Sequence, residues 1–105
     1  MVGHKGNYDQ DIAGVEAVDG HLASIIEASK RNDYAVVITS DHGNCEEMRD
    51  DAVNTLTNHT VGKVWCFVLD SEVKEVHPGA LNNVAPTVLK LMGIEKPHEM
   101  DMPLI

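Results

Sequence analysis

The sequence lacks any long hydrophobic run and has few basic residues. No stretch reaches the roughly 18 consecutive apolar residues of a membrane-spanning helix, so no segment is predicted to cross a bilayer. The start of the chain lacks the basic and apolar regions of a signal peptide, and we expect a cytoplasmic protein. Acidic side chains outnumber basic ones by 17 to 8, for a net charge of −9. This excess disfavours nucleic acid and anionic membranes as partners, because their phosphate groups would be repelled.

Cysteine is also scarce. Cys45 follows a polar turn, whereas Cys66 lies inside an apolar run, so the two residues are in unlike contexts. This pattern predicts two reduced thiols with Cys66 as core filler, and leaves Cys45 as a metal ligand only a minority alternative. The 43% hydrophobic content is typical of a globular core, and 105 residues suffice for one small domain.

Two helices are predicted from the spacing of apolar residues. Residues 7–30 carry apolar side chains every three or four positions, which indicates one amphipathic helix. Asn7 is the expected N-cap, and Asn32-Asp33 is expected to close the helix. A second helix is expected over about residues 83–92, followed by Gly93 as its stop.

Two continuous apolar runs, residues 34–39 and 64–69, predict buried strands. Neither run alternates with polar residues, which is typical of a parallel sheet covered on both faces. Residues 70–80 are expected to form a hairpin or loop, and residues 96–105 an extended tail that packs on the domain. Together these elements predict an α/β fold, with part of a doubly wound parallel sheet, flanking helices and further strands outside this sequence.

The segment Ser40-Asp41-His42-Gly43-Asn44 directly follows the first predicted strand. In open α/β sheets, ligand sites form at the carboxyl ends of the strands. Asp and His are both metal ligands, and a sharp turn can direct adjacent residues to one ion. Gly43 and Asn44 permit such a turn because both tolerate positive φ.

Three histidines, His4, His42 and His59, lie in predicted loops or strand ends beside small or turn-forming residues. Their settings, together with Asp41 beside one of them, favour metal binding. Spacing alone leaves open the alternative of hydrogen-bonded loop histidines, because it matches no compact zinc-finger pattern. Glu46 and Glu47 are either partners of metal-bound histidines or a solvated turn. The other histidines are expected to be ordinary helix or surface residues: His21, His77 and His98.

Five segments, in order and over nearly the whole chain, resemble the cofactor-independent phosphoglycerate mutases of the alkaline phosphatase superfamily. The most specific is Asp41-His42-Gly43-Asn44-Cys45-Glu46, which combines with Ala85-Pro86-Thr87 near the second predicted helix. The remaining matches are Val2-Gly3-His4 with Gly6-Asn7, Val15-Glu16-Ala17-Val18-Asp19 and His59-Thr60.

The resemblance implies an alkaline phosphatase-like fold in which residues 1–105 form the C-terminal part of the metal-binding domain. It implies interconversion of 3-phosphoglycerate and 2-phosphoglycerate through a phosphoserine, with two divalent ions and no organic cofactor. Asp41 and His42 are implied as ligands of the ion that activates the serine, and His4 and His59 as ligands of the second ion. Mn²⁺ is the expected metal, with Zn²⁺ and Co²⁺ as alternatives.

The family's serine nucleophile, its further aspartate ligands and its substrate-holding domain match nothing in this sequence. No catalytic or substrate-binding residue is therefore assigned, and the chain is expected to be an inactive fragment of the enzyme. One alternative is a fragment of a phosphopentomutase or another phosphotransferase of the superfamily, and the other is a non-catalytic metal-binding or assembly module. A strand edge left without its neighbour predicts self-association of the fragment.

Overall fold

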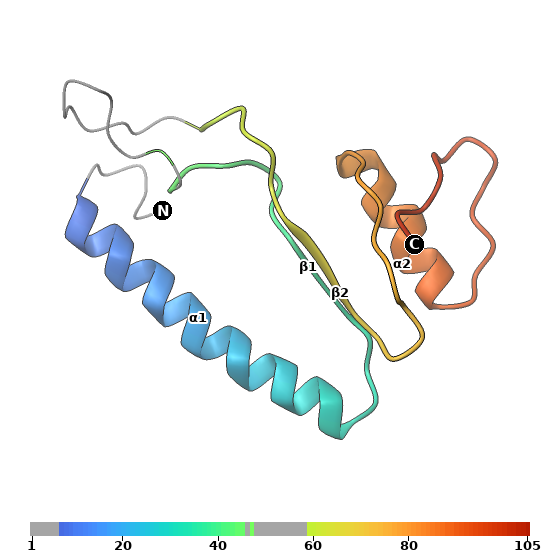
Figure 1. Ribbon diagram of the computed structural model, residues 1–105, viewed down its shortest axis with the longest axis horizontal. Helices are drawn as coiled ribbons and strands as arrows, with labels where there is room; N and C mark the ends of the chain where they lie inside the picture. Colours follow the sequence, from blue (N-terminus) through green and yellow to red (C-terminus); the bar gives the residue numbers. More distant parts are fainter. Residues whose placement is uncertain (1–6, 46, 48–58) are drawn as a thin grey trace.

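The computed structural model describes residues 7–45, 47 and 59–105. Its elements are α1 (Tyr8–Arg31), β1 (Val36–Thr39), β2 (Cys66–Leu69), the short 3-10 helix η2 (Leu81–Asn83) and α2 (Val84–Leu91). The β1–β2 ribbon lies between α1 on one side and α2 with the C-terminal tail on the other (Figure 1). The expected α/β class is confirmed.

Helix α1 forms where the sequence predicts it, displaced by one residue at each end. The Asn7 side chain accepts a hydrogen bond of 3.2 Å from the backbone N–H of Gln10 and so caps the first turn. At the other end the Asn32 N–H bonds back to the last turn, and Asp33 takes a positive φ of 58°. A left-handed residue of this kind ends a helix, so the predicted closure at Asn32-Asp33 is confirmed.

The two strands pair antiparallel, so the parallel sheet predicted from their composition is wrong for this pair. Val36 faces Leu69 and Thr39 faces Cys66. A continuous apolar run indicates burial but carries no information on direction, which depends on the path of the chain between strands. Here a single antiparallel bridge between Gly43 and Thr60 continues beyond the ladder, so the chain returns alongside the strand it left. The described residues form a two-stranded sheet, and no doubly wound sheet is present among them.

One face of the ribbon is less covered than the sequence predicts. The side chains of Trp65 and Phe67 are 79% and 51% exposed, and their rings stack with centroids 6.1 Å apart. Residues two apart in an extended chain share a face, and Ile38 lies opposite Phe67 in the ladder. Trp65 and Phe67 therefore define an apolar face that the described part of the chain leaves open to solvent, and the half-buried Ile38 lies on the same face.

Helix α2 and the C-terminal tail form the best-packed part of the chain. The buried Thr87 hydroxyl donates to the Asn83 carbonyl (2.6 Å) and accepts from the N–H of Leu104 (2.8 Å). The Leu104 carbonyl in turn accepts from the N–H of His77 (2.7 Å), and the Asn83 amide donates to the Met102 carbonyl (2.8 Å). The expected packing of the tail is thus confirmed, although the tail turns at 97–100, where the Met100 N–H bonds to the Pro97 carbonyl, and is not extended throughout. Residues 70–80 form a loop that contributes to the same packing.

The ends of α2 also follow the prediction. Pro86 lies in its first turn, where the missing backbone N–H has no helical acceptor to lose, and its ring is buried. Gly93 has a φ of +69°, and its N–H bonds to the Lys90 carbonyl. Glycine is the residue that adopts this conformation without steric penalty, and it ends the helix as expected.

The chain as a whole is expanded for its length. Its radius of gyration is 16.6 Å, whereas a compact domain of this length has one of about 13 Å. Leu104 is the one aliphatic side chain buried in the described residues. Within the same residues no helix is both long and apolar enough to cross a membrane.

Replacing Gly79 with alanine should destabilise the packing of the tail. A Cβ at Gly79 would collide with Leu104 Cδ2 and lie 2.7 Å from Asn83 Oδ1, and such overpacking costs about 1–3 kcal/mol. Gly20→Ala is the matched control, because a Cβ there meets nothing within 4 Å and should stabilise α1 by about 0.5–1 kcal/mol. Urea denaturation followed by circular dichroism measures both, and shifts of the same sign would contradict this view of the packing.

Candidate metal centre

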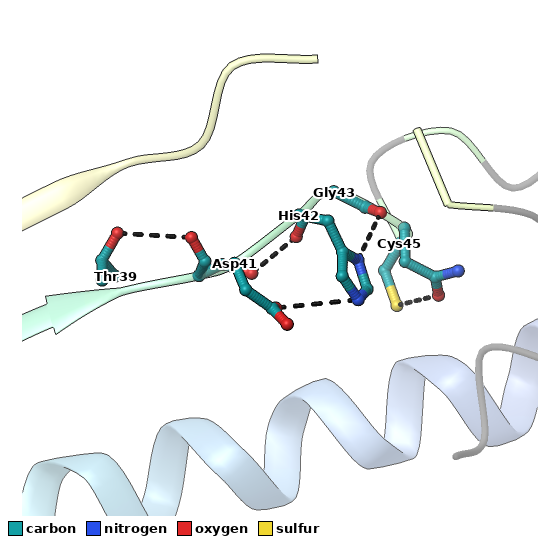
Figure 2. Close-up of polar contacts among 7 residues, drawn as sticks. Thr39, Asp41, His42, Gly43 and Cys45 are labelled. Carbon is teal, nitrogen blue, oxygen red and sulfur yellow. Dashed lines mark hydrogen bonds and ion pairs between the residues drawn. The ribbon is translucent and has the colours of Figure 1, made fainter. Parts of the chain in front are cut away.

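Asp41 and His42 lie just beyond the end of β1, as the sequence predicts (Figure 2). The Thr39 hydroxyl donates to the Trp65 carbonyl (3.0 Å) and ties the end of β1 to the chain that enters β2. The Ser40 hydroxyl donates to the His42 carbonyl (2.6 Å) across the intervening aspartate. These two bonds hold the backbone on both sides of Asp41.

The carbonyl oxygen of Gly43 is the centre of the turn. It accepts a hydrogen bond of 3.0 Å from the backbone N–H of Thr60 and lies 3.0 Å from Nδ1 of His42. A carbonyl oxygen has two lone pairs and can accept both bonds at once. The carbonyl of the buried Gly43 therefore joins the segment after β1 to the segment before β2 and orients the His42 ring.

The bond to Gly43 determines which nitrogen of His42 can bind a metal. A carbonyl only accepts hydrogen bonds, so Nδ1 carries the proton and the neutral ring keeps its lone pair on Nε2. Oδ1 of Asp41 lies 3.6 Å from that Nε2, and Figure 2 shows the carboxylate facing it. Ligands at about 2.0–2.2 Å from an ion stand roughly 3–3.5 Å apart when adjacent. The pair therefore suits two neighbouring ligands of one divalent cation.

His59 lies against His42. The two imidazole rings stack with centroids 3.6 Å apart and an angle of 12° between their planes. The pairing of Thr60 with Gly43 explains this contact, because His59 precedes Thr60 directly. Lone pairs lie in the plane of an imidazole, so parallel rings direct their nitrogens side by side and not toward one point. The arrangement is compatible with two rings that serve two adjacent ions.

The structure thus brings together three of the four predicted ligands. His4 and Glu46 lie outside the described residues. Within those residues, no cluster of three or more His, Cys, Asp or Glu side chains has the geometry to hold a metal ion. The Cys45 thiol is free and exposed, as predicted, and it donates to Asn44 Oδ1 (3.4 Å).

Sequence reasoning missed two features of the site. It treated Gly43 only as a flexible turn residue, whereas its carbonyl orients His42 and pairs with Thr60. It also placed His59 with His4 and did not anticipate the stack on His42. The stack could not be predicted from the sequence around either histidine, because it requires the antiparallel path that the apolar runs did not indicate.

The comparisons with known proteins agree with a metal-dependent class. The chain matches the model of the Metalloenzyme superfamily over residues 1–96, and it belongs to that superfamily. This assignment fits the carboxylate and imidazole donors gathered beyond β1.

Curated relatives make the similarity more specific. The chain is 59% identical to a protein of Wolinella succinogenes and 59% identical to one of Aliarcobacter butzleri, over 99% and 100% of its length. It is 58% identical to a protein of Helicobacter pylori strain J99 over 99% of its length. All three are named 2,3-bisphosphoglycerate-independent phosphoglycerate mutase, which confirms the resemblance drawn from the motifs. The chain spans 21% of the length of each relative.

Divalent cations should bind this chain weakly, and the binding should depend on His42. Two adjacent donors hold an ion less tightly than the three or four donors of a complete site. We therefore expect a Kd for Mn²⁺ or Zn²⁺ above about 1 μM. Isothermal titration calorimetry measures the affinity.

The control for this titration is His98→Ala, since the His98 side chain is 92% exposed and pairs with the neighbouring Glu99. His42→Ala should remove the binding, and His98→Ala should leave it unchanged. Tight binding that survives both His42→Ala and His59→Ala would show that the ion binds elsewhere.

Proposed function

We propose that this chain is the C-terminal, metal-binding part of a cytoplasmic cofactor-independent phosphoglycerate mutase, and that the whole protein interconverts 3-phosphoglycerate and 2-phosphoglycerate. The observation that carries the proposal is the 59% identity to mutases along the entire chain. The geometry beyond β1 supports it, because His42 lies 3.6 Å from the Asp41 carboxylate and stacks on His59.

The proposed roles follow the donor arrangement. Asp41 and His42 hold the ion that activates a serine supplied by another part of the protein, and His59 with His4 holds a second ion. Mn²⁺ is the proposed metal, because a mixed carboxylate and imidazole set suits it. When bound, the two cations neutralise charge on the transferred phosphoryl group and lower the pKa of the attacking hydroxyl. The chain itself orients the ligands through the Gly43 carbonyl and the Ser40 hydroxyl.

A hybrid enzyme tests this proposal. The matching segment of the Wolinella succinogenes mutase is replaced by this chain, and formation of 2-phosphoglycerate is assayed in the presence of Mn²⁺. We expect an active hybrid in which His42→Ala lowers kcat by at least about 100-fold, since even the groups that orient metal ligands are worth about 10–100-fold. His98→Ala is the control and should leave kcat unchanged. A folded hybrid without activity, or one indifferent to His42→Ala, would contradict the proposal.

The chain by itself should show no mutase activity. Phosphoserine formation needs an activated serine, and none of the serines in this sequence matches the family's nucleophile. The measurement is the same assay on the purified chain over a range of concentrations. Formation of 2-phosphoglycerate at a rate proportional to the amount of chain would refute the expectation.

A further inference from the structure

Asp11 is the one charged residue that is buried in the described part of the chain. It lies in the first turn of α1 and is 2% exposed, and neither of its carboxylate oxygens has a hydrogen-bond partner. A carboxylate that loses its hydration without gaining a donor or a cation costs free energy. A nearby positive charge would therefore stabilise Asp11.

Asp11 lies on the side of α1 that faces the β1–β2 ribbon. Where α1 ends, a hollow is lined by Ser29 of the helix together with Val36 and Val68 of the strands, which identifies the side that faces the ribbon. Asp11 precedes Ser29 by about five helical turns of 3.6 residues, so both residues lie on that side. Asp9, in the same first turn, is about 200° round the helix axis from Asp11 and is exposed.

Asp11 is also at the same end of the molecule as the Asp41–His42 turn. Residues 32–35 join α1 to β1, and the two elements run back alongside each other from this corner (Figure 1). Asp11 lies about 30 Å from the corner along the helix, and Gly43 about 25–30 Å from it along the extended chain. Figure 2 shows the Asp41 and His42 side chains on the side of the turn where α1 passes.

We propose that Asp11 is a further acidic group of the metal centre, which stabilises the divalent cation held by Asp41 and His42 without ligating it. The inference rests on the proposed function, because it concerns the same cation. In the described part of the chain no three such side chains have the geometry to hold one ion, so Asp11 is assigned an outer position. A buried charge is screened less than an exposed one, so its attraction for a cation extends beyond direct contact. The cation in turn supplies the positive charge that Asp11 lacks.

The substitution Asp11→Asn tests this role because it removes the charge and almost preserves the shape. Isothermal titration calorimetry of the full chain with Mn²⁺ should give a Kd raised by at least about threefold. Asp9→Asn is the matched control, because it removes the same charge from the same turn at an exposed position on the opposite side. It should leave the Kd unchanged. Circular dichroism shows whether each variant retains α1.

Thermal unfolding gives a second measurement, which a purely structural role of Asp11 would not reproduce. Without metal, Asp11→Asn should raise the Tm, because the amide buries no charge. Saturating Mn²⁺ should raise the Tm of the unmodified chain more than that of the variant, since the variant binds the cation less tightly. An equal Mn²⁺-induced rise in both would make Asp11 a structural residue only and would overturn the inference.

The outcomes separate this inference from the proposed function. An unchanged Kd in Asp11→Asn, with binding still abolished by His42→Ala, overturns the role of Asp11 and leaves the proposed metal centre intact. Equal weakening by Asp9→Asn assigns the effect to the overall charge of the chain and overturns the role as well. Binding that does not depend on His42 contradicts both the role of Asp11 and the proposed metal centre.

Discussion

The carbonyl oxygen of Gly43 is the group on which the arrangement of the site depends. It accepts one hydrogen bond from Thr60 and one from the His42 ring. The first bond joins the segment that leaves β1 to the segment that enters β2, and the second leaves the lone pair of the neutral His42 ring on Nε2. His59 lies on His42 because it precedes Thr60. Removing either bond would loosen the arrangement of His42 and His59, which we propose as metal ligands.

The C-terminal part of the chain is hydrogen-bonded and packed, whereas α1 and the β1–β2 ribbon expose apolar side chains. At the C-terminus, Thr87 and Asn83 bond to the backbone of the tail, and Leu104 is buried between α2 and the 70–80 loop. Along α1 and the β1–β2 ribbon, apolar side chains remain exposed and the radius of gyration exceeds that of a compact domain. Apolar surface of this extent in water is unfavourable at about 25 cal/mol per Å².

Local features were predictable from the sequence. The Asn7 cap, the left-handed residue after α1 and the Gly93 stop each follow from the chemistry of one or two neighbouring residues. The position of Asp41 and His42 beyond a strand was predictable for the same reason, since a run of β-branched residues ends directly before them.

Long-range features were not predictable in the same way. Strand direction depends on how the chain returns after Gly43, and an apolar run is compatible with either direction. The His42–His59 stack depends on that return, so no local sequence pattern could predict it. The exposure of Phe67 could not be predicted because burial depends on what covers a strand, and the described chain does not contain the cover.

We propose that the turn held by Gly43 positions Asp41, His42 and His59 as metal ligands. The most direct test is a ¹H–¹⁵N NMR spectrum of the chain with substoichiometric Mn²⁺, because a paramagnetic ion broadens only the signals near it. We predict that broadening begins at the amides of His42, Gly43 and His59 and spares those of His77 and His98. Broadening that begins at His77 or His98, or that spreads evenly over the acidic surface of α1, would contradict the claim.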